Sequence, residues 1–148
     1  PESSLELIST ESFSNSSIKS IIIPKSVKII EKSSFSPCDN LKEFHIDNEA
    51  QVSINDFAIG SICLRGFSIP ALAKSISSCA FYHCENLNSI EFLGNDIVFD
   101  QNCSFLENIS FLSFPNADNI SIIVYHCYLN EKIIIFSKYS ANIKIEIK

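Results

Sequence analysis

A pattern of about 23 residues recurs along this 148-residue chain, and it restricts the possible folds more than any other feature. A shift of 46 residues superimposes one apolar pattern on another, and proline, phenylalanine and cysteine then coincide in identity. The first copy is marked by Ile18, Ile21, Ile23, Pro24, Val27, Ile30, Phe35 and Cys38, and the second by Leu64, Phe67, Ile69, Pro70, Ala73, Ile76, Phe81 and Cys84. Shorter copies fall between and after them, at Leu41, Phe44 and Ile46, at Leu87, Ile90 and Phe92, and at Ile109, Leu112, Phe114 and Pro115.

Recurrence at this period indicates a solenoid, in which each repeat forms one coil that stacks on the next. Each copy predicts one short strand whose first, fourth and sixth side chains point inward. The proline that follows removes a backbone donor and ends the strand. Because one coil cannot bury its apolar face alone, stacked coils share a core beneath a parallel sheet. We therefore expect one inner column formed by Ile23, Ile46, Ile69 and Phe92.

Composition supports strands rather than long helices. Isoleucine, which fits a pleated surface, and serine, which fits turns, each occur 25 times. We expect a single array over residues 1–148. It would comprise a partial repeat at 1–17, about 4.5 repeats of 22–23 residues at 18–115, and degenerate repeats with a terminal strand at 116–148. The chain starts with proline and contains no methionine, which predicts a fragment of a longer protein.

Charge and motif content exclude several classes of function. A net charge of -6 argues against a nucleic-acid partner, which requires clustered Lys and Arg. No apolar run reaches the roughly 20 residues that a transmembrane helix needs. The pair Cys79 and Cys84 with His83, and Cys127 beside His126, lack the spacing of a zinc site. The histidines occupy different repeat phases, so no catalytic constellation is recognised. We expect no enzyme activity, no metal and no cofactor.

The repeat resembles the BspA-like class of leucine-rich repeats, through residues 18–38 and 64–84 and the shorter copies. The family's usual glycine is replaced by Glu31 and Ser77, and its alanine before phenylalanine is present as Ala80 but replaced by Ser34. The resemblance implies an α/β leucine-rich-repeat arc, with a parallel sheet on the concave face and short strands and helical turns on the convex side. It also implies an extracellular or cell-surface recognition module for adhesion. An intracellular, cytoplasmic scaffold for signalling partners is the alternative.

Outward strand positions form the predicted ligand-binding face. A solvated sheet face without a ligand is the other interpretation, because the mixed charge indicates no ligand class. We expect protein or glycan ligands, and the sequence does not determine the oligomeric state. The predicted face consists of Lys19, Ile22, Lys42, His45, Arg65, Ser68, Glu91 and Phe111.

Cysteines fall into two groups. Cys38 and Cys84 lie two repeats apart, about 10 Å by strand spacing, which is too far for a disulfide. We expect them to be small buried hydrophobic residues. Cys79, Cys103 and Cys127 are spaced close to one repeat apart, so an adjacent pair could be cross-linked or all three could be thiols.

Four asparagines begin the triplet Asn-x-Ser, namely Asn15, Asn102, Asn108 and Asn119. These would be glycosylation sites in a protein secreted by a eukaryote. In any other context the triplets have no such meaning.

Overall fold

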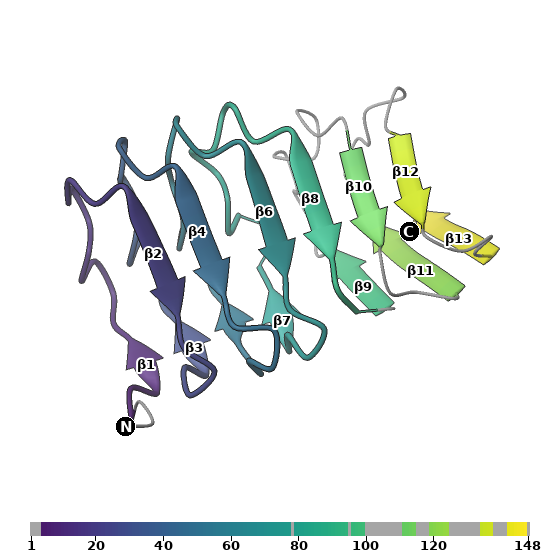
Figure 1. Ribbon diagram of the computed structural model, residues 1–148, viewed down its shortest axis with the longest axis horizontal. Helices are drawn as coiled ribbons and strands as arrows, with labels where there is room; N and C mark the ends of the chain where they lie inside the picture. Colours follow the sequence, from purple (N-terminus) through teal and green to yellow (C-terminus); the bar gives the residue numbers. More distant parts are fainter. Residues whose placement is uncertain are drawn as a thin grey trace.

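Two layers of parallel strands form the molecule (Figure 1). The computed structural model describes residues 4–77 and 79–94 in full, and the backbone of the strands that lie between residues 96 and 147. The front layer contains β2 (Ser20–Ile23), β4 (Glu43–Ile46), β6 (Gly66–Ile69), β8 (Ser89–Phe92), β10 (Phe111–Phe114) and β12 (Ile134–Ser137). The back layer contains β1 (Leu7–Ile8), β3 (Ile29–Ile30), β5 (Ser53–Ile54), β7 (Ser75–Ile76), β9 (Asp96–Phe99), β11 (Asn119–Val124) and β13 (Asn142–Ile147). Each coil therefore supplies one front strand and one back strand.

The front strands place equivalent residues of successive repeats side by side. Ile23 pairs with Ile46, and Ile69 pairs with Phe92, in parallel register. All four side chains are buried, so they form the inner column that the repeat predicts. The predicted solenoid with a parallel strand layer is therefore confirmed. Strands β2 and β6 end directly before Pro24 and Pro70, as expected for a residue without a backbone donor.

Neither layer is one continuous sheet. In front, β2 pairs with β4, and a separate sheet has the order β12-β10-β8-β6. Behind, one sheet has the order β1-β3-β5-β7 and another the order β13-β11-β9. The front layer is thus interrupted between β4 and β6, whereas the back layer is interrupted one coil later, between β7 and β9. At each of these two boundaries the other layer keeps its ladder, because β5 pairs with β7 and β6 pairs with β8.

The helical turns expected on the convex side are wrong, because the described residues contain no helix. Where it is described, the back layer has strands of two to six residues instead, so the α/β class is corrected to a β-solenoid over these residues. Amides at its short strands donate to carbonyls of the preceding coil. The amide of Ser53 donates to the carbonyl of Lys28 at 2.8 Å, and that of Lys74 to Val52 at 2.8 Å. β-Branched residues such as Ile29 and Ile30 favour this extended pairing.

Phenylalanine rings form a continuous chain through the core. Phe13 stacks on Phe35 with ring centroids 4.8 Å apart, and Phe35 meets the edge of Phe44 at 5.0 Å. Phe67 lies 5.7 Å from Phe44 and 4.8 Å from Phe81. This chain of five rings crosses successive coils, so each coil depends on its neighbours for burial.

Candidate functional site

The predicted face residues lie on or beside the front strands. Lys19, Lys42 and Arg65 come immediately before β2, β4 and β6, and all three are exposed. Ile22 in β2 and His45 in β4 are exposed, while Ser68 in β6 and Glu91 in β8 are half-buried. Phe111 is the first residue of β10, and its side chain lies outside the described residues. Ile22 and His45 are partners in the β2–β4 ladder, and Ser68 and Glu91 are partners in the β6–β8 ladder.

A break in the sheet lies at the centre of this face, because no ladder joins β4 to β6. At the neighbouring boundaries, the amide of Asp47 donates to the carbonyl of Ile23 at 2.9 Å and that of Leu93 to Ile69 at 3.0 Å. The equivalent position after β6 is Pro70, which has no N–H to donate. Gly66, which opens β6, further weakens strand pairing. Together they leave β4 and β6 adjacent but not hydrogen-bonded.

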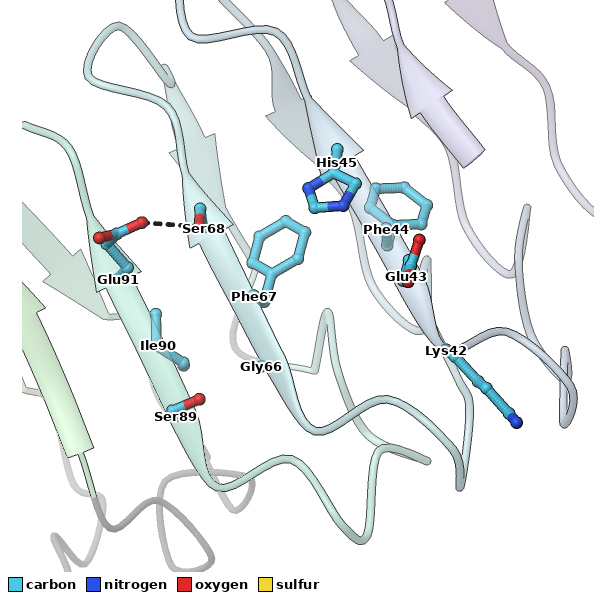
Figure 2. Close-up of a pocket in the computed structure, with 10 residues that line it drawn as sticks. All are labelled: Lys42, Glu43, Phe44, His45, Gly66, Phe67, Ser68, Ser89, Ile90 and Glu91. Atoms are coloured by element: carbon cyan, nitrogen blue, oxygen red, sulfur yellow. Dashed lines mark hydrogen bonds between the residues drawn. The ribbon is translucent and has the colours of Figure 1, made fainter. Parts of the chain in front are cut away.

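A pocket of about 400 Å³ opens on the front face over this break (Figure 2). Within it, Ser68 Oγ donates a hydrogen bond to Glu91 Oε2 at 2.9 Å. Because Gly66 has no Cβ, the Ser89 hydroxyl keeps its place at the pocket, 2.8 Å from where that Cβ would be. The lining residues are Lys42, Glu43, Phe44, His45, Gly66, Phe67, Ser68, Ser89, Ile90 and Glu91.

The pocket combines apolar and polar groups in a way that suits binding. Phe44, Phe67 and Ile90 are buried at their strands and present only small apolar areas to it. Polar side chains from β4, β6 and β8 surround that floor. A second hollow of about 520 Å³ lies between Ile22 and His45 on one side and the turn at residues 46–49 on the other. Ile22 in β2 is 75% exposed, the highest value among the exposed large hydrophobic residues of the described part of the chain.

The sequence did not predict this pocket. Strand alternation identifies outward positions, but it does not indicate where a ladder is interrupted. The available signal was Pro70 together with Gly66, at opposite ends of one front strand.

Buried cysteines stabilise the coil rather than perform chemistry. Cys38 and Cys84 are thiols that donate to carbonyls of the preceding coil, Phe13 at 3.0 Å and Ile59 at 3.5 Å respectively. Burial raises the pKa of the Cys84 thiol from 9.0 to about 11, partly offset by a backbone hydrogen bond from Ser61. A thiol that stays protonated at neutral pH is a poor nucleophile. Among the described residues, His, Cys, Asp and Glu form no group that could hold a metal ion.

Of the three cysteines that could form a cross-link, the structure describes only Cys79. Cys79 is half-buried, and its carbonyl accepts hydrogen bonds from the amides of Phe57 and Tyr82. Cys103 and Cys127 lie outside the described residues, so the possible cross-link stays a prediction.

Of the four Asn-x-Ser triplets, the structure describes one side chain. Asn15 is exposed, and its amide nitrogen donates to Ser14 Oγ at 3.2 Å. Asn119 begins β11, but its side chain is not described, and Asn102 and Asn108 lie outside the described residues. Glycosylation stays a prediction at all four.

Comparison with known proteins supports the repeat assignment. The family model described as BspA type leucine rich repeat region matches residues 3–144 in six copies. A search of curated proteins and a search of solved structures returned no match. In the part of the chain described here, no helix is long and apolar enough to cross a membrane. The six-copy match covers nearly the whole chain and agrees with the stacked coils, so the chain belongs to the BspA-type leucine-rich repeat family.

Proposed function

We propose that this chain is a non-enzymatic recognition module of a cell-surface protein, and that its front face, which we expect to be concave, binds protein partners in adhesion. The family supports a protein-interaction repeat module, and its members are often surface-associated. One observation supports the front face in particular. The exposed Ile22 and the pocket over the β4–β6 break lie on the same face, on neighbouring strands.

Together these features resemble the anatomy of a protein interface. Affinity at interfaces comes from a few apolar or aromatic anchors with polar groups around them, rather than from total area. Ile22 supplies the apolar anchor. Its ladder partner His45 lines the pocket, which also offers Ser68 and Glu91 as polar contacts.

A binding screen with matched variants tests the proposal. The intact chain would be immobilised and exposed to purified extracellular-matrix and cell-surface proteins in biolayer interferometry. Ile22→Asp should weaken any binding by at least about tenfold, since it places a charge at a desolvated anchor. Leu72→Asp is the matched control, because Leu72 is 52% exposed in a turn outside the front strands. Equal losses in both variants would contradict a role for the front face.

An intracellular scaffold is the second candidate, and one observation favours it. The described cysteines Cys38, Cys63 and Cys84 are thiols, as in a reducing compartment. Burial protects Cys38 and Cys84 in any compartment, so Cys63, which is only half-buried, is the informative residue. Thiol labelling of the protein in intact cells with a membrane-impermeant maleimide distinguishes the two candidates. Labelling of Cys63 without permeabilisation supports a surface location, and labelling only after permeabilisation supports the scaffold.

A further inference from the structure

Three cations occupy the same position in three successive coils. Lys19, Lys42 and Arg65 are each separated by 23 residues, and each immediately precedes a front strand. The amide of Lys42 donates to the carbonyl of Lys19 at 2.8 Å, which fixes the first two side by side. Asn88 holds the equivalent position in the next coil and donates to the carbonyl of Arg65 at 3.0 Å, so the charged row ends there. We call Lys19, Lys42 and Arg65 the basic row.

No member of the basic row forms an ion pair within the described part of the chain. Lys25 and Lys28, by contrast, form ion pairs with Glu49 and Glu6. Like charges on neighbouring strands repel one another. This row lies in a protein whose net charge is -6. Its arrangement therefore suits an anionic ligand better than it suits the stability of the fold.

The geometry of the row favours one kind of ligand. Lys19 and Lys42 precede paired strands, which lie about 4.8 Å apart, and Arg65 precedes the next front strand, across the β4–β6 break. An extended peptide presents side chains on one face about every 6.7 Å. Its acidic side chains would therefore not match cations that are one strand spacing apart. A six-membered sugar ring adds a length close to one strand spacing to a linear polysaccharide. Figure 2 shows the Lys42 side chain extending away from the other pocket residues, which places Lys42 at the rim of the pocket.

We propose that the basic row binds a linear acidic polysaccharide that has one carboxylate or sulfate on each sugar ring and lies along the solenoid axis. Arg65 can hold one acid group with two parallel hydrogen bonds, and the two lysines act as point charges. This inference rests on the proposed recognition role of the front face and adds a second ligand class at the residues that precede its strands.

Polygalacturonate, which has one carboxylate on each ring, is the probe that tests the row. The intact chain should bind fluorescent polygalacturonate in anisotropy titrations, with the logarithm of the association constant falling about two units per decade of salt for three contacts. Lys42→Glu should weaken binding by roughly tenfold, since it removes an attraction and adds a repulsion. Lys74→Glu makes the same charge change at an exposed residue that precedes β7 in the back layer, and should change binding less than about twofold.

Neighbouring Glu43 offers a change in the opposite direction. It is exposed beside Lys42 and repels an anion at the row, so Glu43→Gln should strengthen polygalacturonate binding. Neutral dextran should not bind, and poly-glutamate and single-stranded DNA should bind more weakly than polygalacturonate. No binding at low salt, equal losses in Lys42→Glu and Lys74→Glu, or tighter binding of either competing polyanion would overturn the proposal.

The two proposals fail separately. Ile22→Ser, which removes the apolar side chain without adding a charge, should weaken protein binding and leave polygalacturonate binding intact, because it changes the face and not the charge near the row. Loss of protein binding in that variant while polysaccharide binding persists supports both proposals. If polygalacturonate binding is absent while protein binding at Ile22 is present, only the polysaccharide site is wrong.

Discussion

Phe35 and Ile59 occupy the same place in successive coils, are joined by a parallel β-bridge and are fully buried. Phe81 holds that place in the following coil. The smaller Ile59 lies where the front strands contribute the larger residues, because Phe44 and Phe67 stand at the position held by Ile90 in the next coil. We infer that the small Ile59 offsets the two front-strand rings in the close-packed core.

Ile59→Phe should destabilise the protein, although it restores the more common residue at that position. The extra ring would compete with Phe44 and Phe67 for the same space, and overpacking costs about 1 to 3 kcal/mol. Urea denaturation followed by circular dichroism measures the change. Combining Ile59→Phe with Phe67→Ile should recover part of the loss. A double variant that is less stable than the sum of the single changes would contradict this offset.

Phe81→Ala should reduce the free energy of unfolding by about 3 to 5 kcal/mol, because Phe81 is fully buried and contacts Phe67. Ile69→Ser should also be strongly destabilising, because it removes an inner-column side chain. Lys42→Ala should leave stability nearly unchanged, because Lys42 is exposed. Similar losses for Phe81→Ala and Lys42→Ala would show that inward and outward positions are assigned wrongly.

Gly60 and Gly66 should respond differently to replacement by alanine. A Cβ at Gly60 would lie 2.9 Å from the Cβ of Ser36 and 3.0 Å from that of His83, so backbone must shift in the neighbouring coils. At Gly66 the nearest atom is the rotatable Ser89 hydroxyl, and the next is 3.9 Å away. Gly60→Ala should therefore cost roughly 1 to 3 kcal/mol, and Gly66→Ala much less. Parallel thermal and urea melts would compare them, and equal costs would argue against the tight packing at Gly60.

Stability should fall in alkali partly because of Cys84. Its pKa is about 11 in the folded chain against 9.0 ordinarily, so below pH 9 the thiol is protonated in both states and contributes no pH dependence. Between pH 9 and 11 the unfolded state releases the proton first, which favours unfolding by about 1.4 kcal/mol per pH unit. Urea denaturation at intervals from pH 8 to 11 should show a shallower decline for Cys84→Ala than for the parent. Identical slopes would remove Cys84 as the cause.

Ser33→Gly should stabilise the chain. Glu11, Ser33 and Phe57 occupy equivalent turns with φ of 57°, 55° and 54°, a region that non-glycine residues enter at a cost of roughly 1 to 2 kcal/mol. Glycine relieves this strain but loses more entropy on folding, so the net gain is up to about 1 kcal/mol. Ser33→Ala, which keeps the strained Cβ, is the control and should give no gain. Thermal denaturation of the two variants decides the matter.

The strand layer could be predicted from the sequence because apolar residues recur at a fixed period and proline marks the strand end. Ile23, Ile46, Ile69 and Phe92 are buried for that reason. The two-residue back strands could not be located in this way, because strands as short as Ser53–Ile54 have no periodicity of their own. Their conformation depends on amides that pair with the preceding coil. The expectation of helical turns came from the family resemblance and not from the residues of this chain, and it was wrong for the described residues.

The candidate site was predictable only in outline. Alternation along β4 and β6 identifies His45 and Ser68 as outward residues, but their local sequence does not show that the two strands lack a ladder. That interruption depends on a donor missing at Pro70, whose partner carbonyl is one coil away. The hydrogen bond between Ser68 and Glu91 likewise depends on register between coils. A repeat predicts the stacking order, whereas a pocket arises where one copy departs from it.

The front layer is interrupted at one coil boundary and the back layer at the next, so the two weak points lie on opposite faces of the array. At the β4–β6 boundary the coils can spread apart in front while the bonds from β5 to β7 act as the fold line. At the following boundary the β6–β8 ladder becomes the fold line and the rear can spread. We therefore expect the array to change its curvature in opposite directions at these two boundaries, while each coil keeps one ladder to its neighbour.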